Sequence, residues 1–280
     1  MTKRAAPDRD SARDTDALIR AHGKAAYAWV ASSLVYFFKG TPITHPPWIA
    51  TALPFRSPSG RVILLTALHC VDEIEKGPHA LGYADGEPTY EDALASTIAG
   101  PEGVDVALAL LRPGVDRALL DVALDPGLVA ASTDAGAAQN QYCIIAGFPY
   151  AIMKHEPFVP GIELRRVRSI THGTTIHGID DRCRLRADWN TAVVQDIEPE
   201  GGRQLGLSPG QRIELPAPQG ISGGALWRFT GQTPTDVLWV PQKRAHLIGI
   251  PTAFLPESRI ELCESVAVWG DWFREKIAAL

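Results

Sequence analysis

The chain has 280 residues, a formal net charge of −5 and an apolar content of 45%, which suffices for one large or two modest domains. The negative charge and the absence of a long basic run argue against a dedicated nucleic-acid binder and against a polybasic membrane anchor. Four widely spaced cysteines without a Cys-x-x-Cys pair argue against a zinc site (Cys70, Cys143, Cys183 and Cys263). We therefore expect no metal and no other cofactor.

The N-terminal segment bears on localisation. Met1 to Asp16 is mostly charged or small and lacks the apolar core of a secretory signal. Ala25 to Phe38 is too short an apolar stretch to span a membrane. We therefore expect a cytoplasmic protein with reduced thiols and no membrane association.

The predicted elements in the first half of the chain are mainly strands. Residues 1–13 are expected to be disordered, and Asp14 and Thr15 are suitable caps for a helix that ends near Ala28. Runs rich in β-forming residues then predict strands at residues 32–38, 48–55, 61–67 and 104–111. Residues 113–140 carry Pro, Gly, Ser and Asp without sustained alternation and are predicted to be a connector.

The second half continues with strands and ends in a helix. Strands are predicted at residues 141–146, 162–170, 225–229 and 246–250, with a glycine-rich loop at residues 201–210. Residues 265–280 are predicted to form a helix, because apolar residues recur there at helical spacing (Val266, Trp269, Trp272, Phe273 and Ile277). We expect this apolar face to pack on the body of the protein.

Three separate segments carry residues suited to nucleophilic catalysis. Gly220 and Gly223 flank Ser222 in a segment too rich in glycine to be an ordinary strand or helix. His69 ends an apolar run far upstream, and Asp105 lies in a second apolar run between the two. A serine hydroxyl needs a base within hydrogen-bond reach and a third group to fix the tautomer of that base. The order His, Asp, Ser matches one of the convergent triad arrangements.

Each of these residues would fill a distinct role. His69 suits the general base because its unperturbed pKa lies near physiological pH. Asp105 is preferred as the group that orients His69, although Asp121 and Asp125 remain alternatives. The backbone amides of Gly220 and Ser222 are predicted to form an oxyanion hole, since two converging N–H donors stabilise a tetrahedral intermediate.

The motifs resemble those of chymotrypsin-like (trypsin-like) serine peptidases. Thr66-Ala67-Leu68-His69-Cys70 resembles the family's Thr-Ala-Ala-His-Cys, Asp105-Val106-Ala107-Leu108 resembles Asp-Ile-Ala-Leu, and Gly220-Ile221-Ser222-Gly223-Gly224 resembles Gly-Asp-Ser-Gly-Gly. Ala146-Gly147-Phe148-Pro149 and Ile248-Gly249-Ile250-Pro251-Thr252-Ala253 resemble segments of the bacterial branch that includes HtrA-like peptidases. The resemblance covers roughly residues 28–260.

The resemblance implies an all-β fold of two antiparallel six-stranded barrels, with an N-terminal and a C-terminal helix and the site in the cleft between the barrels. The expected divisions are a tail and helix at 1–28, a first barrel with His and Asp at 29–125, a second barrel with Ser and the oxyanion hole at 126–260, and a helix at 261–280. The resemblance places Pro216 and Ala217 at the base of the specificity pocket. The strand that pairs with substrate, and lines the pocket walls, contains Ile250, Pro251, Thr252, Ala253 and Phe254. None of these residues is charged, so we expect cleavage after small or medium apolar side chains.

The chain departs from the family pattern at three places. Ile221 stands where the animal digestive enzymes carry the Asp that binds a newly cut N-terminus, so that activation bridge is not available. No cysteine precedes Cys70, so its usual disulfide partner is missing. Ile49-Ala50-Thr51-Ala52 stands where the family often has Gly-Ser-Gly or Gly-Thr-Gly.

These observations predict a serine endopeptidase that acts on protein or peptide substrates through an acyl-enzyme intermediate. Without the activation bridge, control would need another route, such as a regulatory protein partner. The alternative is a latent or inactive protease-fold module that binds a partner protein, and an esterase with the same machinery is a further hypothesis. An α/β-hydrolase also has Gly-x-Ser-x-Gly, but too few residues follow Ser222 for the strand–helix units of that fold.

Overall fold

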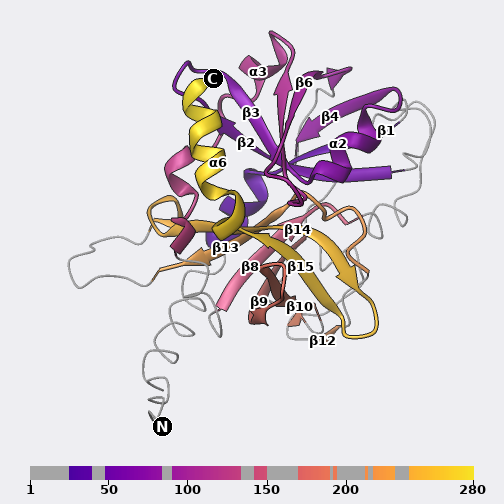
Figure 1. The fold of residues 1–280 in the computed structure, drawn as a ribbon, viewed down its shortest axis with the longest axis vertical. Helices are drawn as coiled ribbons and strands as arrows, with labels where there is room; N and C mark the ends of the chain where they lie inside the picture. Colours follow the sequence, from indigo (N-terminus) through magenta and orange to yellow (C-terminus); the bar gives the residue numbers. More distant parts are fainter. Residues whose placement is uncertain are drawn as a thin grey trace.

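The computed structural model describes residues 25–39, 48–83, 90–133, 142–149, 170–189, 192–193, 212–213, 217–230 and 240–280. Within this part, two antiparallel β units lie one above the other and helices flank them at both ends of the chain (Figure 1). The predicted disordered tail, the first part of the predicted N-terminal helix, the glycine-rich loop at 201–210 and most of the predicted strand at 162–170 lie outside the described residues.

The first unit is a curled sheet that does not close into a barrel. Its seven strands follow the order β5-β4-β1-β2-β3-β7-β6. They are β1 (Val35–Lys39), β2 (Trp48–Arg56), β3 (Val62–Thr66), β4 (His79–Tyr83), β5 (Tyr90–Glu91), β6 (Leu94–Ala99) and β7 (Ala107–Leu111). All of their pairings are antiparallel.

The second unit is a closed barrel with the order β10-β15-β14-β13-β8-β9. Its strands are β8 (Tyr142–Gly147), β9 (Ile170–Ile179), β10 (Arg184–Asp188), β13 (Ala225–Phe229), β14 (Ala245–Leu255) and β15 (Ile260–Ser265). A separate two-stranded sheet pairs β11 (Ala192–Val193) with β12 (Arg212–Ile213). Closure leaves the barrel without a free strand edge.

The helices are short except at the C-terminus. They are residues 25–32, α2 (Leu68–Ile74), α3 (Val115–Ala118), the 3-10 turns η1 (Pro126–Leu128) and η4 (Pro241–Lys243), and α6 (Val266–Ala279). Ser265 caps α6, because its hydroxyl accepts a hydrogen bond from the Ala267 N–H at 3.3 Å. As Figure 1 shows, α6 runs along the first sheet, where the Phe273 ring meets Phe55 of β2 with centroids 4.9 Å apart. In the described part of the chain, no helix is both long and apolar enough to cross a membrane.

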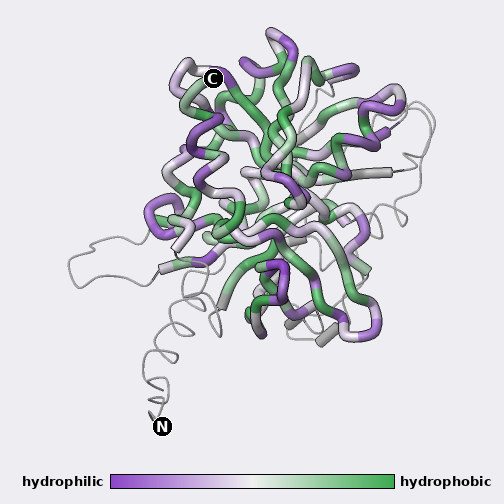
Figure 2. Tube along the Cα trace, viewed as in Figure 1, coloured by the Kyte–Doolittle hydropathy of each residue, from purple (hydrophilic) through white to green (hydrophobic). Residues whose placement is uncertain are grey.

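One buried apolar cluster runs through both units. It joins Phe55 and Leu65 of the first sheet to Ile144 and Trp227 of the barrel and to Phe273 of α6. Figure 2 shows the hydrophobic residues concentrated along the strands, with hydrophilic residues at the loops. A second cluster lies within the first sheet alone.

The predicted fold class is confirmed: the chain is mostly β, with two antiparallel units and helices at both ends. The first unit differs in detail, because the two-residue strand β5 extends one edge and does not pair with β6 at the other. Residues 104–106 precede β7 and are not part of a strand as predicted. The predicted connector at 113–140 contains α3 and η1, which its Pro and Gly residues did not indicate.

Candidate active site

His69 lies in the first turn of a short helix that follows directly after β3. β3 ends at Thr66, Ala67 is the N-cap, and α2 begins at Leu68. Cys70, Val71 and Ile74 form the buried side of α2. This packing leaves the His69 side chain 43% exposed, so its imidazole faces a region that solvent or substrate can reach.

Asp105 binds His69 at two points. Its Oδ1 accepts a hydrogen bond from the His69 backbone N–H at 2.9 Å, and its Oδ2 lies 2.6 Å from the ring Nδ1. An ionised carboxylate can only accept hydrogen bonds, so Nδ1 must carry the proton. Nε2 is then the basic nitrogen of the neutral ring, as a general base requires.

Two opposing effects set the charge of Asp105. Partial burial raises its pKa, whereas the hydrogen bonds from the His69 ring and backbone, the charge of His69 and the backbone of Leu68 lower it. The net effect is a pKa below the ordinary value for aspartate. Asp105 therefore stays ionised at neutral pH.

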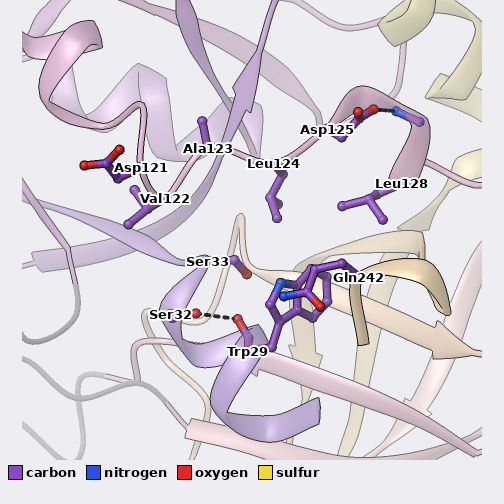
Figure 3. A pocket seen from close by; sticks show the side chains of 11 residues that line it. Trp29, Ser32, Ser33, Asp121, Val122, Ala123, Leu124, Asp125, Leu128 and Gln242 are labelled. Atoms are coloured by element: carbon purple, nitrogen blue, oxygen red, sulfur yellow. Dashed lines mark hydrogen bonds between the residues drawn. The ribbon is translucent and has the colours of Figure 1, made fainter. Parts of the chain in front are cut away.

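The two alternative acids lie elsewhere. Asp121 and Asp125 line a cavity of about 710 Å³ between residues 25–33 and the segment Asp121 to Leu128 (Figure 3). Asp125 caps η1, because its Oδ1 accepts the Gly127 N–H at 2.6 Å. None of the residues that line this cavity belongs to the candidate site, and Asp105 is the carboxylate that contacts His69.

Ser222 lies half-buried in a tight loop before β13. The Ile221 N–H donates to Pro218 O at 2.9 Å and the Gly224 N–H donates to Ile221 O at 2.8 Å. Gly220 and Gly223 both have positive φ, at 97° and 80°, a region that disfavours residues with a Cβ atom. The two glycines therefore allow the loop to turn sharply around the serine.

Thr51 of β2 connects this loop to the first sheet. Its N–H donates to Ser222 O at 2.9 Å, and its hydroxyl donates to Gly220 O at 3.0 Å. The same hydroxyl accepts the N–H of Phe148 at 2.9 Å, and Thr51 O accepts from the hydroxyl of Thr66 at 2.7 Å. In the sequence, Thr51 is notable only as part of a departure from the family pattern. The residue directly holds the loop that carries Ser222.

The two amides predicted as an oxyanion hole are available in the described part of the chain. Neither the Gly220 N–H nor the Ser222 N–H donates a hydrogen bond to a described residue. Both carbonyl oxygens, by contrast, accept hydrogen bonds from Thr51. An anion-binding role for the two N–H groups stays a prediction.

Among the described hydrogen bonds, none joins His69 Nε2 to the hydroxyl of Ser222. Cys70 lies beside both residues, with its Sγ 3.5 Å from Nε2 and 3.7 Å from Ser222 O. Burial, and then the charge of Asp105, raises the pKa of the Cys70 thiol well above its ordinary value. Cys70 therefore stays un-ionised and is not a rival nucleophile. The structure therefore pairs His69 with Asp105, and the Cys70 sulfur contacts both the His69 ring and the backbone oxygen of Ser222.

The predicted substrate-binding residues lie mainly on β14. Pro251 O accepts a hydrogen bond from the Gly223 N–H at 2.8 Å, which connects the serine loop to this strand. The Thr252 hydroxyl donates to Leu262 O at 3.4 Å, Ala253 is half-buried, and Ile250 is fully buried in the core. Ala217 is exposed, and Pro216 lies outside the described residues.

Two acids in β15 were not predicted as residues of the site. Glu264, almost completely buried, accepts a hydrogen bond from the backbone of Asp105, and burial raises its pKa although Arg184 acts in the opposite direction. Glu261 is buried with an exposed fraction of 1%. The available signal was the presence of two carboxylates in the otherwise apolar segment 260–265.

The cysteines provide a first testable prediction. All four are free thiols, and Cys183 is exposed whereas Cys70, Cys143 and Cys263 are buried. We expect one thiol to react with Ellman's reagent in the native protein and all four in denaturant, and a reducing agent to leave the melting temperature unchanged. A Cys183→Ala variant serves as control and should lose the native signal. A fast-reacting thiol that remains in that variant would contradict the burial of the other three cysteines.

Comparison with known proteins places the fold. No family model and no curated protein matches the chain. The serine endoprotease from Yersinia pestis matches over 92% of this chain and 66% of its own, with a TM-score of 0.50 and 13% identity. The fold is trypsin-like. The MamO protease domain from Magnetospirillum magneticum matches over 86% of this chain and 96% of its own, with a TM-score of 0.49 and 13% identity. The chain thus spans about two thirds of the Yersinia protein.

Proposed function

We propose that the protein is a serine endopeptidase. The observation that carries the proposal is the His69–Asp105 pair, joined at 2.6 Å, beside a serine loop with two available backbone amides. The trypsin-like fold and the motif matches of residues 66–70 and 220–224 support it. The matches of residues 146–149 and 248–253 further support a place in the HtrA-like branch.

The proposed mechanism follows from the protonation state of His69. Nε2 takes the proton of the Ser222 hydroxyl as the oxygen attacks the carbonyl carbon of the scissile bond. The Gly220 and Ser222 N–H groups stabilise the resulting oxyanion, and Asp105 stabilises the imidazolium. His69 then gives the proton to the leaving amine, and water hydrolyses the acyl-enzyme by the same steps. The Ser222 hydroxyl must first come within hydrogen-bond reach of Nε2, and such contacts often tighten only when substrate binds.

Labelling with a fluorophosphonate probe tests the proposal. We expect the intact protein to be labelled, and Ser222→Ala and His69→Ala each to abolish labelling because the probe reacts only with an activated serine. Ser96→Ala, which removes an exposed hydroxyl on β6, is the matched control and should label normally. Labelling that persists in Ser222→Ala would refute the assignment of the nucleophile.

A protease-fold module that binds a partner is the second candidate. The described hydrogen bonds favour it at one point, since His69 Nε2 faces Cys70 and not the Ser222 hydroxyl. An intact, folded protein that the probe does not label would support this candidate. A labelled protein that cleaves small esters but no peptide would support an esterase.

The proposal extends to substrates and location. The substrates would be proteins or peptides that pair with β14, and a regulatory protein partner would replace the missing N-terminal activation bridge at Ile221. We propose a cytoplasmic location, on the basis of the four free thiols.

A further inference from the structure

Glu261 is a carboxylic acid that is buried without a cationic partner in the described part of the chain. Its side chain is 1% exposed, and its Oε2 has no hydrogen-bond partner among the described residues. Burial alone raises the pKa of Glu261 well above the ordinary value, and no cation of the described segments lowers it. A buried, unsatisfied carboxyl costs folding free energy, so its presence calls for an explanation.

The strand pairing places Glu261 next to β14, the strand that is predicted to pair with substrate. Cys263 of β15 lies opposite Pro251, the residue whose carbonyl binds the serine loop through Gly223. Glu261 is two residues further along, about 7 Å at the usual rise of a strand, and pairs with Phe254. Alternate residues of a strand face the same side, so the Glu261 and Cys263 side chains share one face.

This end of the hairpin opens toward solvent on the β14 side. Pro251 is buried, Ala253 and Phe254 are half-buried, and Leu255 is 37% exposed. β14 pairs with β13 only as far as Gly249, so among the described pairings its edge away from β15 is free beyond that residue. A substrate chain that pairs with this edge would lie across β14 from Glu261. A long side chain of that substrate, if it passes below β14 into the barrel, would approach the Glu261 carboxyl.

The nearest arginine in the sequence does not satisfy this acid. Arg259 Nη2 donates to Trp189 O at 3.5 Å, and no ion pair joins Glu261 to a cation among the described residues. A cation from outside would remove the unfavourable burial, because a paired and hydrogen-bonded charge is the stable form of a buried carboxylate.

We propose that Glu261 is a specificity residue that selects a lysine or arginine side chain of the substrate. The inference rests on the proposed peptidase function and deepens it. It replaces the apolar preference expected from the sequence, since that expectation rested on Pro216, Ala217 and uncharged residues of β14 and did not include β15. The basic side chain would enter beside Phe254 and donate its hydrogen bonds to the Glu261 carboxylate.

Selectivity is the first arm of the test. Two fluorogenic peptides would differ only before the cleaved bond, with lysine in one and its neutral isostere norleucine in the other. We expect kcat/KM to favour lysine by about 10²-fold or more, since a site built for a polar group discriminates strongly against an analogue that lacks it. Glu261→Gln should reduce this ratio at least tenfold. Glu257→Gln, the same change in the exposed turn of the same hairpin, is the matched control and should keep the ratio.

Binding of a small cation is the second arm and needs no catalysis. n-Butylammonium and n-butylguanidinium would be titrated into the intact protein and into Glu261→Gln by calorimetry, with 1-pentanol as the neutral probe. We expect the cations to bind the intact protein and to bind Glu261→Gln at least tenfold more weakly. Gln keeps the shape of the protonated acid, so the variant should fold, and a melting curve would verify this.

The two arms separate the inference from the function. A labelled protein that prefers norleucine and ignores the cations would overturn the inference and leave the peptidase proposal intact. A protein that resists the fluorophosphonate probe, yet binds the cations only when Glu261 is present, would support the cation site and overturn the peptidase proposal. Equal cation binding by both forms would overturn the role of Glu261.

Discussion

Asp105→Asn should lower the rate of fluorophosphonate labelling, and of any peptide hydrolysis, by about 10⁴-fold. The asparagine amide would fill the same space, but it would present a donor to His69 Nδ1 and favour the tautomer with the proton on Nε2. The ring could then neither accept the serine proton nor be stabilised as an imidazolium. The measurement is the second-order labelling rate constant, compared with that of the intact protein.

Asp121→Asn is the matched control for this prediction. Asp121 lines the distant cavity of Figure 3, so the same chemical change there should leave the labelling rate within about twofold of normal. A large loss in Asp121→Asn and a small loss in Asp105→Asn would show that the wrong carboxylate had been assigned to His69.

The pKa of Asp105 adds a pH signature to this variant. The pKa of Asp105 in the folded protein lies below the ordinary value for aspartate, so the unfolded chain binds the proton at higher pH than the native state does. The stability that ionised Asp105 provides is therefore present above about pH 4 and is lost as the pH falls through the lower native pKa. The difference in urea midpoint between the intact protein and Asp105→Asn should shrink in that acidic range.

Gly223→Ala should destabilise the protein by about 3 kcal/mol or more and abolish labelling. A Cβ atom on Gly223 would lie 2.1 Å from Thr66 Oγ1, 2.2 Å from Thr51 O and 3.0 Å from Ala67 N. Two of these atoms are backbone atoms, one in β2 and one in the N-cap residue of α2, and cannot rotate away. The serine loop would have to leave β2 and β3, and Ser222 would move with it. Urea unfolding and probe labelling measure the two effects.

Gly60→Ala controls for backbone strain. Gly60 has nearly the same positive φ, 82° against 80°, but a Cβ there would meet nothing within 4 Å. This variant should lose only about 1–2 kcal/mol, the cost of placing a side chain in the left-handed region, and should label normally. Equal losses in the two variants would mean that the loop does not press on Thr51 and Thr66.

Local sequence patterns predicted the parts of the fold that depend on local forces. The spacing of Trp269, Phe273 and Ile277 predicted α6, and the structure buries these residues. The β-rich runs predicted β1, β2 and β3 to within a few residues. The open edge of the first sheet was not predicted, because it depends on whether β5 and β6 meet, and neither segment reveals that by itself.

The residues of the candidate site that lie in sequence motifs were predicted, and the others were not. The context of His69 and Asp105 indicated the pair that the structure joins. Thr51 and Glu261 escaped notice because their significance comes from contacts between distant segments. Thr51 binds a residue 169 positions away, and a buried acid looks like an exposed one until its strand partners are known. The contact of Cys70 Sγ with Ser222 O, 152 positions away, has the same origin.

The helices near the two ends of the chain each pack on the β unit that is not adjacent to them in the sequence, and this affects how the protein folds during synthesis. The helix at residues 25–32 leads into the first sheet, yet its Trp29 ring packs on Trp227 of the barrel with centroids 5.2 Å apart. Conversely, α6 follows the last strand of the barrel and covers Phe55 of the first sheet. The first sheet therefore keeps an uncovered apolar face until the C-terminal helix has left the ribosome, although it is made first. Neither unit completes its core before the other, so the contacts between the serine loop and the first sheet gain their full support only after α6 has been synthesised.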